Sequence, residues 1–532
     1  MIMRKIITII IIIFSSLSAI AQWSQTAKVI SSDRYLSDVF GHSLSADDSV
    51  LISGAPMQDS DSNTQNVVAD AGAAYIFLKD SMGNWQESQK ICASDRHVED
   101  YFGTAVAVDA NTIIVGADQT DINNSMLHSS GSAYIFEKGG DSKYVQMQKI
   151  EASDRKANAY FGQVVDLSGN FAIIGSPDDY TDSLNLSSPY KAGSAYIFEK
   201  NSAGTWIQVQ KLTAPDADTL DYFGISVSIY NNTAIVGACY HQQNSVGLDA
   251  LPGAGAAYIY QRSANGRWNL KQKIVNNDRN SGDLFGKNVS IFGDYIFVSS
   301  KNNTDSLGNN PIMGASAIYV FKKDNNGDFV QWQKLCVYDR AAALGFACAV
   351  DLNNQYAIIG AQYVHGPYYG YQIGAAYAYN KSSNGKWYFE QKLVANEDEA
   401  NDYFGRSVAL NSQTIFISSH NGYDATGNNY QGLAGSVYVF GKTSVGIASA
   451  ERIEVEYGPN PSHGYFEINL QKEMQIINLE VYNMLGQKVF EHSYYNTKQL
   501  QLNLQLAKGM YIVALQSELG DLARIKLNID EH

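Results

Sequence analysis

The sequence has little of what a disulfide scaffold or a nucleic-acid-binding surface requires. Only four cysteines occur in 532 residues, so disulfides are not the framework of the fold. Because Cys348 lies in an apolar, strand-like stretch, buried free thiols are favoured over disulfides for Cys92, Cys239, Cys336 and Cys348. Basic residues are also scarce, since 38 Lys and Arg face 53 Asp and Glu and give a net charge of -15. This charge repels phosphate backbones and anionic membranes, so a nucleic-acid partner is not expected.

Long apolar runs are missing outside the N-terminal segment "MIMRKIITIIIIIFSSLSAIAQ". That segment has a basic start, an apolar run from Ile6 to Phe14, and small residues at Ala19 and Ala21 in the A-x-A relation. The pattern predicts a secretory signal peptide over residues 1–21 with cleavage before Gln22. The apolar run is too short to span a membrane, and the mature chain is expected to have no transmembrane segment.

A Phe-Gly pair recurs along the chain and marks an internal repeat. Successive pairs are nearly evenly spaced except for one interval of double length before Phe404, which "LGFACAVD" divides in half if Leu344-Gly345 stands for Phe-Gly. Repeats of this length are fractions of one fold rather than separate domains. The alignment gives seven copies, with Phe40, Phe102, Phe161, Phe223, Phe285, Leu344 and Phe404 at the repeated position.

Three further phrases recur in a fixed order after the Phe-Gly pairs. They are typified by "LISGAP" at 51, "GAAYIF" at 72 and "WIQVQKL" at 206, and each is short and rich in β-branched or aromatic residues. Turn residues separate several of them, and no helical period is present. Four antiparallel strands per copy, repeated at about 60 residues, predict an all-β fold containing a seven-bladed β-propeller, which leaves few sheet edges exposed.

The count of fourth phrases predicts how the ring closes. The seventh copy lacks this phrase after "SVYVFGK" at 436, whereas "WSQTAKVI" at 23–30 precedes the first copy. Trp23 stands before Trp85, and Lys28 before Lys90, at the same interval that separates Phe40 from Phe102. We therefore expect a propeller over residues 22–442 in which strand 23–30 completes the last blade. Such a propeller is expected to be monomeric.

The repeat resembles the FG-GAP repeat of the integrin alpha-subunit head over residues 23 to 442, although the full Gly-Ala-Pro survives only at Gly54-Ala55-Pro56. Calcium-binding blades of that family carry a D-x-D-x-D-G-like loop between the first two strands. Here the equivalent stretches, such as "LSGNFA" and "IYNNTA", are plain hairpin turns, so no cofactor is expected there. Calcium remains possible elsewhere, and a weaker cage is conceivable at Asp59, Asp61 and Asn63, where a solvated polar loop is the favoured alternative.

The repeated Phe is interpreted as a structural residue that fills the wedge between neighbouring sheets, while the Gly lets the backbone pass closely. "SDR" triplets precede several pairs, as at Asp33-Arg34, Asp95-Arg96 and Asp154-Arg155. They could form a charged ring. Turn-capping carboxylates and surface ion pairs are the favoured interpretation.

The segment after the repeat reads as a linker over residues 443–456 and a separate domain over 457–532, for which about six short strands suggest a small β-sandwich. This tail resembles the C-terminal sorting domain of type IX secretion cargo. The motif positions are Pro459, Asn460, Pro461, Gly486, Gly509, Tyr511 and Lys526. The resemblance implies Sec export to the periplasm of a Gram-negative bacterium, handling by the type IX machinery, and release or attachment at the outer-membrane surface.

No catalytic motif was found. Sialidase-type Asp boxes, a G-x-S-x-G elbow, H-E-x-x-H and paired Cys-x-x-Cys are absent from the sequence, and the nine histidines are scattered. A non-enzymatic binding or adhesion protein with an extracellular glycan or protein ligand is the leading hypothesis. A secreted propeller hydrolase or lyase acting on polysaccharide is the alternative, because the fold alone does not decide function.

The loops joining second and third strands are the long, variable segments, and they are expected to emerge with the inter-blade loops on one face. Tyrosines are concentrated in "QYVHGPYYGYQI" and in the loop of the following blade. Rigid amphipathic rings can stack on sugars or pack on a partner, or they can cover the blade end. The candidate ligand-binding residues are Tyr363, His365, Tyr368, Tyr369, Tyr371, His420, Tyr423 and Tyr430.

Overall fold

The computed structural model contains strands and turns but no helix among the residues that it describes. The described residues are 22–121, 128–181, 189–248, 250–301, 312, 315–337, 345–365, 372–396, 402–420, 431–443, 455–458, 465–483, 488–504, 506–517 and 522–529. The predicted signal peptide lies outside them. The chain divides into two compact units, of which Trp23–Thr443 is the larger.

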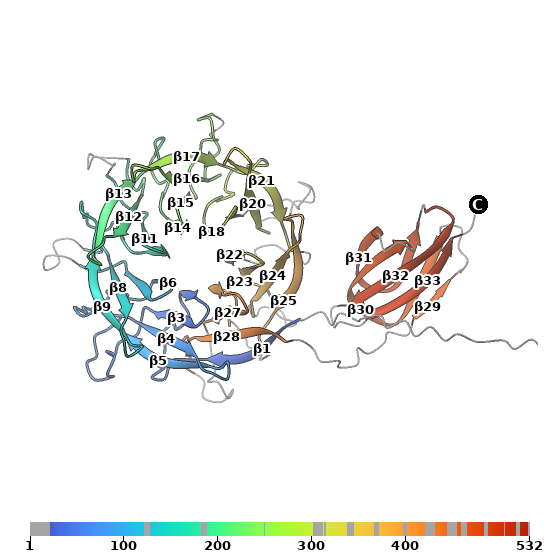
Figure 1. Ribbon diagram of the computed structural model, residues 1–532, viewed down its shortest axis with the longest axis horizontal. Helices are drawn as coiled ribbons and strands as arrows, with labels where there is room; N and C mark the ends of the chain where they lie inside the picture. Colours follow the sequence, from blue (N-terminus) through green and yellow to red (C-terminus); the bar gives the residue numbers. More distant parts are fainter. Residues whose placement is uncertain are drawn as a thin grey trace, which may run out of the picture. The chain divides into compact units, whose positions relative to one another are not determined.

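The larger unit is a β-propeller built from seven four-stranded antiparallel sheets arranged around a central axis (Figure 1). The first blade has strands β2 (Leu44–Ala46), β3 (Val50–Ala55), β4 (Ala73–Lys79) and β5 (Trp85–Ile91). The second has β6 (Ala105–Asp109), β7 (Thr112–Ala117), β8 (Ser132–Lys138) and β9 (Tyr144–Ile150). The third has β10 (Val164–Ser168), β11 (Phe171–Ser176), β12 (Ser194–Lys200) and β13 (Trp206–Leu212). The fourth has β14 (Ser226–Tyr230), β15 (Thr233–Ala238), β16 (Ala256–Arg262) and β17 (Trp268–Ile274).

The remaining blades close the ring. The fifth has β18 (Val289–Phe292), β19 (Tyr295–Ser300), β20 (Ala317–Lys323) and β21 (Phe329–Leu335). The sixth has β22 (Phe346–Leu352), β23 (Tyr356–Ala361), β24 (Ala375–Lys381) and β25 (Trp387–Leu393). The seventh sheet has the order β1-β28-β27-β26, with β1 (Gln22–Val29), β26 (Val408–Leu410), β27 (Thr414–Ser419) and β28 (Ser436–Thr443). The N-terminal strand is therefore the outer strand of the last blade, which is the pairing that the count of strand phrases predicts.

The core consists of clusters between adjacent sheets, and the repeated Phe lies at the centre of each contact. Phe102 is fully buried, and its ring packs edge-on against Tyr134 at 5.4 Å and Phe136 at 6.0 Å between ring centroids. Gly103 follows with φ +99°, and a Cβ there would lie 2.4 Å from the carbonyl oxygen of Ala73. Because only glycine avoids that clash, Phe-Gly recurs for packing reasons, as predicted.

Blade six corrects the sequence alignment. Leu344 lies outside the described residues, and Phe346 provides the ring, which packs edge-on against Tyr377 at 5.6 Å. The carbonyl of the next residue, Ala347, accepts a hydrogen bond at 3.0 Å from Nδ2 of Asn288 in blade five. In the same way, the carbonyl of Gly286 in blade five accepts a hydrogen bond from Ser226 in blade four. Phe346-Ala347 is therefore the counterpart of Phe-Gly, and the alignment on Leu344-Gly345 is wrong by two residues. The pair was missed because Ala347, with φ +64°, adopts a left-handed conformation in place of glycine.

Glutamines tie the outer strands of neighbouring blades together. Gln210 Nε2 donates to the carbonyl of Trp268 at 2.6 Å, and its Oε1 accepts from the Trp268 N–H at 2.9 Å. The same pair of hydrogen bonds joins Gln89 to Tyr144, Gln148 to Trp206, Gln272 to Phe329, Gln333 to Trp387 and Gln391 to Trp23. We call this arrangement the glutamine clamp. It fixes the spacing of the blades at the outer edge of the ring.

The four cysteines are free, as predicted. Cys239 is buried and the other three are half-buried, so the fold depends on packing and hydrogen bonds rather than on covalent cross-links.

The smaller unit contains β29 (Val455–Gly458), β30 (Tyr465–Asn483), β31 (Lys488–Asn503), β32 (Gly509–Ser517) and β33 (Leu522–Ile529). One hydrogen-bonded network has the order β29-β30-β32-β33, and β31 also pairs with β30. Both halves of the long β30 contribute to one core, which includes Phe466, Ile468, Leu479 and Val481. The tail is thus all-β, with continuous long strands rather than the six short ones predicted.

The sorting-motif residues are only partly described. Tyr511 is buried and its hydroxyl donates to the carbonyl of Ala507 at 2.8 Å, and Gly509 begins β32 two residues earlier. The backbone of Lys526 pairs with Ile512. Pro459, Asn460, Pro461 and Gly486 lie outside the described residues.

Candidate binding site on the long-loop face

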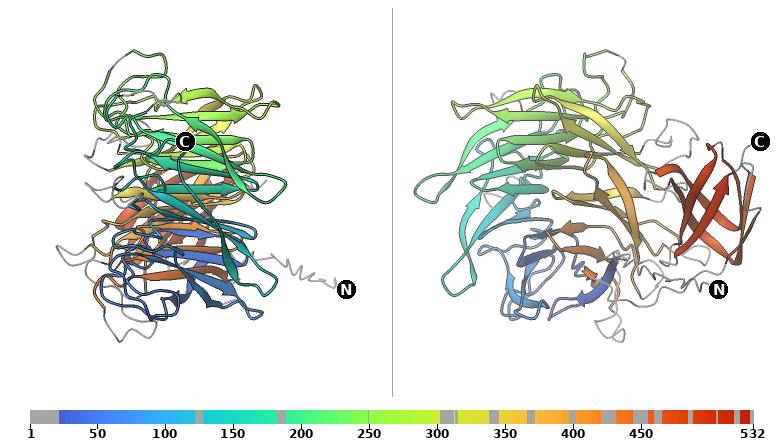
Figure 2. Two further views of the ribbon diagram at one scale, coloured as in Figure 1. Left: turned by 90° about the vertical axis from the view of Figure 1, so that its left-hand side faces the viewer. Right: turned by 45° about the vertical axis from the view of Figure 1, so that its right-hand side comes forward.

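Two sets of loops form one end of the propeller, which we call the long-loop face. One set joins the second and third strands of each blade, and the other joins each blade to the next. Backbone hydrogen bonds connect the two sets, for example from Tyr101 N to Asp70 O and from Phe102 N to Ala71 O, both at 3.1 Å. The tight hairpins leave the sheets at the opposite end (Figure 2). The predicted arrangement of the loops is therefore confirmed.

Two arginines that follow the repeated inter-blade Asp fasten these loops, namely Arg96 in an "SDR" triplet and Arg279 in "NDR". Arg96 donates to the carbonyl of Asn66 at 3.1 Å and to that of Asp59 at 2.6 Å, and Arg279 donates to the carbonyl of Gln242 at 2.8 Å. In both cases the carbonyls belong to the long loop of the preceding blade. These guanidinium groups connect the inter-blade loops to the long loops and so stabilise the conformation of the long-loop face.

The aspartates of the inter-blade loops are paired with residues of the blade that follows. Asp33 forms an ion pair with Lys90 at 2.7 Å and accepts from the Tyr75 hydroxyl at 2.6 Å. Burial raises the pKa of Asp33, but the hydrogen bonds from Lys90 and Tyr75 lower it overall. Asp95, Asp154, Asp216 and Asp278 make the same contacts with the Lys and Tyr of their own blades. These carboxylates are ion-paired rather than part of a free charged ring, and several pairs are more buried than the surface pairs expected from the sequence.

The weak metal candidate is a loop that satisfies its own carboxylates. Asp61 Oδ1 accepts from the N–H groups of Asn63 and Gln65, both at 2.9 Å, and these bonds lower the pKa of Asp61 to about 2. Asp59 Oδ1 accepts from Asp70 N at 2.8 Å. Asn63 contributes its backbone N–H. Across the described ranges no group of three His, Cys, Asp or Glu side chains is arranged to hold a metal ion.

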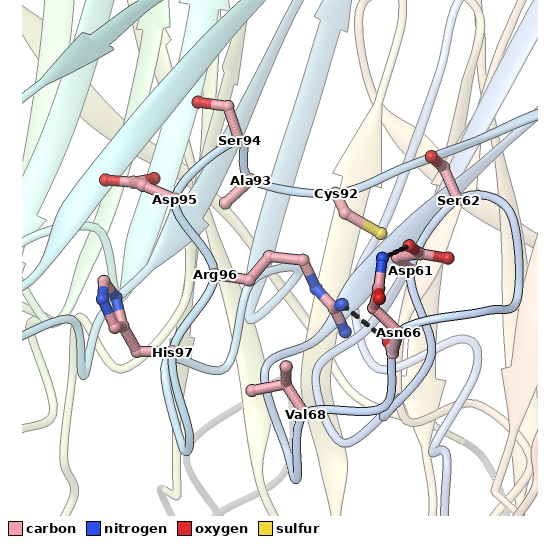
Figure 3. Close-up of a pocket in the computed structure, with 10 residues that line it drawn as sticks. All are labelled: Asp61, Ser62, Asn66, Val68, Cys92, Ala93, Ser94, Asp95, Arg96 and His97. Atoms are coloured by element: carbon pink, nitrogen blue, oxygen red, sulfur yellow. Dashed lines mark hydrogen bonds between the residues drawn. The ribbon is translucent and has the colours of Figure 1, made fainter.

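A polar hollow of about 520 Å³ lies beside this loop (Figure 3). Asp61, Cys92, Arg96 and His97 are among its lining residues. The Arg96 guanidinium extends across it toward Asn66, and its donors are directed at the loop carbonyls described above. The hollow therefore offers few uncommitted polar groups.

The predicted aromatic site is partly described. Tyr363 is 38% exposed, His365 forms an isolated β-bridge with Gln372, and His420 is partly buried. The remaining predicted residues lie outside the described residues: Tyr368, Tyr369, Tyr371, Tyr423 and Tyr430.

The structure joins Tyr363 and His420 through Tyr403, a residue that the sequence analysis did not select. The Tyr403 ring lies 6.0 Å from Tyr363 and 6.1 Å from His420, between ring centroids. Three residues further along the chain, Arg406 lies 3.3 Å from His42 Nδ1 across the junction of blades seven and one. Tyr403 and Arg406 flank Phe404-Gly405. They were missed because this phrase is explained by the structural repeat and gives no functional signal for the residues beside it.

The two imidazoles of this cluster are uncharged at neutral pH. Burial, with a smaller contribution from the Arg406 charge, lowers the pKa of His42 to about 4 and that of His420 to about 3. His420 Nε2 is buried and has no hydrogen-bond partner among the residues that the structure describes. The cluster thus combines one guanidinium, two neutral imidazoles and two tyrosine rings.

A second group of tyrosines lies on the long-loop face at blades three and four. Tyr222 and Tyr240 have ring centroids 5.4 Å apart, and the Lys191 ammonium lies 5.8 Å from the Tyr222 ring and 5.6 Å from the Tyr190 ring. Tyr190 is 61% exposed and Tyr240 is 47% exposed. Lys191 is held by Asp178 at 2.6 Å. The sequence analysis missed this group because its members come from three different loops.

Comparisons with known families agree with this architecture. Residues 457–527 match the secretion system C-terminal sorting domain, which supports secretion by the type IX system to the cell surface or the extracellular space. No helix in the described part of the chain has the length and apolar character needed to cross a membrane. Comparison with curated proteins finds no match.

Six segments match the FG-GAP repeat, at residues 23–77, 85–136, 144–198, 206–260, 268–321 and 387–440. The unmatched stretch between the last two contains β22, β23 and β24 of blade six, whose Phe346-Ala347 departs from the motif. Because the matched segments make up more than half of the chain and each contains the outer strand of one blade and the first three strands of the next, the chain belongs to the FG-GAP repeat family.

Proposed function

We propose that this secreted β-propeller is a non-enzymatic binding or adhesion protein that contacts an extracellular glycan or protein through its long-loop face. The observation that carries the proposal is the grouping of partly exposed tyrosine rings at two places on that face. Tyrosine offers a large contact area at low entropic cost, and its hydroxyl can stay hydrated or bond to a partner.

The burial of a pair of ionisable side chains also supports a binding role. Asp221 and His241, 2.8 Å apart, are the kind of pair that acid–base chemistry uses. Both side chains are almost completely buried, and Asp216 and Lys273 also contact His241. These groups connect the inter-blade loop to the blade and are not accessible to a substrate.

A glycan array and a cell-surface pull-down with the chain from Gln22 to His532 test the proposal. Two variants separate the tyrosine groups, namely Tyr190→Ala with Tyr240→Ala, and Tyr363→Ala. Tyr388→Ala is the matched control, because Tyr388 is 54% exposed on the outer strand β25. We expect at least one tyrosine variant to weaken binding about tenfold or more, equivalent to about 1.4 kcal/mol, while the control binds normally.

Two results would overturn the proposal. One is a ligand whose affinity stays within a factor of two in both variants while their folds remain intact. The other is turnover of a polysaccharide by the purified chain, which would favour the hydrolase or lyase alternative.

A further inference from the structure

The residue two positions after the repeated Phe occurs once per blade, at the long-loop end of the innermost strands. The innermost strands β2, β6, β10, β14, β18, β22 and β26 contact one another in a closed ring around the axis. The residues at this position lie one or two places before their strands, or inside β22 in blade six, and are His42, Thr104, Gln163, Ile225, Lys287, Cys348 and Arg406. Both charged members of this set are cations, although the protein as a whole carries a charge of -15.

The cations lie on neighbouring blades of the ring. Arg406 is next to His42, and the charges of both Arg406 and Lys287 act on the Cys348 thiol, whose pKa burial raises to about 11. Blades five, six, seven and one therefore present a continuous run of Lys287, Cys348, Arg406 and His42, which we call the cationic arc. Blades two, three and four contribute Thr104, Gln163 and Ile225, which carry no charge.

Arg406 has no ion-pair partner among the residues that the structure describes. Within the described ranges no carboxylate lies within 4.0 Å of its guanidinium, and Nη2 of Arg406 lies 3.3 Å from Nδ1 of the neutral His42 imidazole. By contrast, Arg262 pairs with Glu199 at 3.1 Å on the outer part of the propeller. A partly buried guanidinium without a counter-charge is a site that an incoming anion can complete.

The opposite end of the innermost strands carries the carboxylates, and these are already engaged. Asp166 Oδ2 accepts from Ile229 N at 2.8 Å, and Asp351 Oδ2 accepts from Leu410 N at 2.9 Å, in each case on the next blade. Asp47 Oδ2 accepts from Ala110 N at 3.0 Å in the same way. The acidic end therefore connects blades, whereas the cationic arc retains unused donors.

We infer that the cationic arc binds the carboxylate or sulfate group of an acidic saccharide, with the sugar rings against Tyr363 and Tyr403. This inference rests on the proposed binding function and names its ligand class. A planar guanidinium forms two parallel hydrogen bonds to either anion, and the Tyr403 ring lies between Tyr363 and the partly buried His420. The cationic arc is small and the rest of the protein is negatively charged. A separate carboxylate or sulfate group can bind to the arc alone, whereas an extended phosphate backbone would also be repelled by the acidic surface around it.

Binding of polygalacturonate, dextran sulfate and neutral dextran to the chain from Gln22 to His532 tests the inference. Arg406→Gln removes the central charge and Lys287→Gln removes an exposed one, so the second variant remains informative if the first unfolds. Arg267→Gln is the control, because Arg267 is exposed in the β16–β17 hairpin at the opposite end and its loss changes the net charge equally.

We expect an acidic polymer to bind, with affinity falling at least tenfold in Arg406→Gln, less in Lys287→Gln and not in Arg267→Gln, and to weaken as salt is raised. Binding by only one of the two acidic polymers identifies the anion. Failure of both acidic polymers to bind overturns the inference, as does equal loss in the control. Binding of neutral dextran alone, unchanged in Arg406→Gln, overturns the acidic-saccharide inference while the proposed binding function stands.

Discussion

The contact between β1 and blade one differs from the other six contacts between neighbouring outer strands. At those six contacts a glutamine clamps the backbone of the first aromatic residue of the next outer strand, as Gln391 does to Trp23. In β1 the corresponding position is Ala27, which faces blade one and the aromatic residue Trp85. The glutamine clamp is therefore missing where the first and last blades meet.

Other contacts at this junction follow the repeat. Phe40 bridges to Gly435 as Phe102 does to Gly72, and the Trp85 ring packs edge-on against Phe416 at 4.9 Å. Glu87 accepts two hydrogen bonds from Ser32, both at 2.7 Å, where the next blades use glutamines to contact Ser94 and Ser153. The inner packing of the ring is thus uniform, and the difference is confined to the outer edge.

Deleting Gln22 to Ile30 should have the largest effect. The deletion removes the buried Trp23 and Val29, leaves β28 of blade seven as an uncovered sheet edge and removes the neighbour of the outer strand of blade one. We expect loss of the cooperative unfolding transition or a Tm lower by more than about 5 °C, measured by circular dichroism. Removing residues 444–532 is the control and should leave the propeller transition in place, because they belong to the other compact unit. A shift of only about 1 to 2 °C on deleting the strand would contradict the closing role of β1.

Replacing the repeated, buried Phe should reduce the free energy of unfolding by the same amount at the junction of blades seven and one as at the other contacts between blades. Phe40→Ala, Phe404→Ala and Phe346→Ala are each expected to reduce the free energy of unfolding by about 3–5 kcal/mol, as core truncations do. Chemical denaturation provides the measurement. A cost for Phe346→Ala as small as that of a surface substitution, below about 0.5 kcal/mol, would show that Phe346-Ala347 is not the counterpart of Phe-Gly in blade six.

Restoring the missing clamp should give the smallest effect, and in the stabilising direction. Ala27→Gln places an amide where it can bond to the N–H and carbonyl of Trp85, and we expect a gain of about 0.5–1.5 kcal/mol in the free energy of unfolding. The reverse change, Gln391→Ala, should cost about 1–3 kcal/mol because two hydrogen bonds to Trp23 are lost. If Ala27→Gln destabilises the protein while Gln391→Ala is neutral, the clamp does not contribute to stability.

The sequence was most informative where one residue type repeats at one position. The spacing of Phe-Gly and of the aromatic residue at the start of the fourth strand was enough to predict the blades and the place of β1. It misplaced the repeat in blade six, because Ala347 adopts the left-handed conformation that glycine provides in the other blades. It treated the repeated Asp as a turn cap or a member of a surface ion pair and missed the partly buried pairing, since contacts with a Lys and a Tyr far along the chain leave no local pattern.

The candidate site was predicted only in part for the same reason. Tyr363 and His420 were found by local enrichment in long loops, but Tyr403 and Arg406 stand inside a phrase that packing alone explains. The group formed by Tyr190, Tyr222 and Tyr240 could not be found from composition, because each residue comes from a different loop.

By itself the sequence determined the all-β class, the repeat and the strand that closes the ring, because these depend on periodicity and on short-range turn chemistry. Only the tertiary structure decided which charged side chains are paired within the protein and which can contact a ligand. The aspartates form ion pairs with lysines or accept hydrogen bonds from tyrosines and backbone N–H groups of adjoining elements. Arg406 instead contacts a neutral imidazole across the junction of blades seven and one. A charge is paired or unpaired according to what lies within a few ångströms of it, and in a ring of seven blades those neighbours can be hundreds of residues away in the chain.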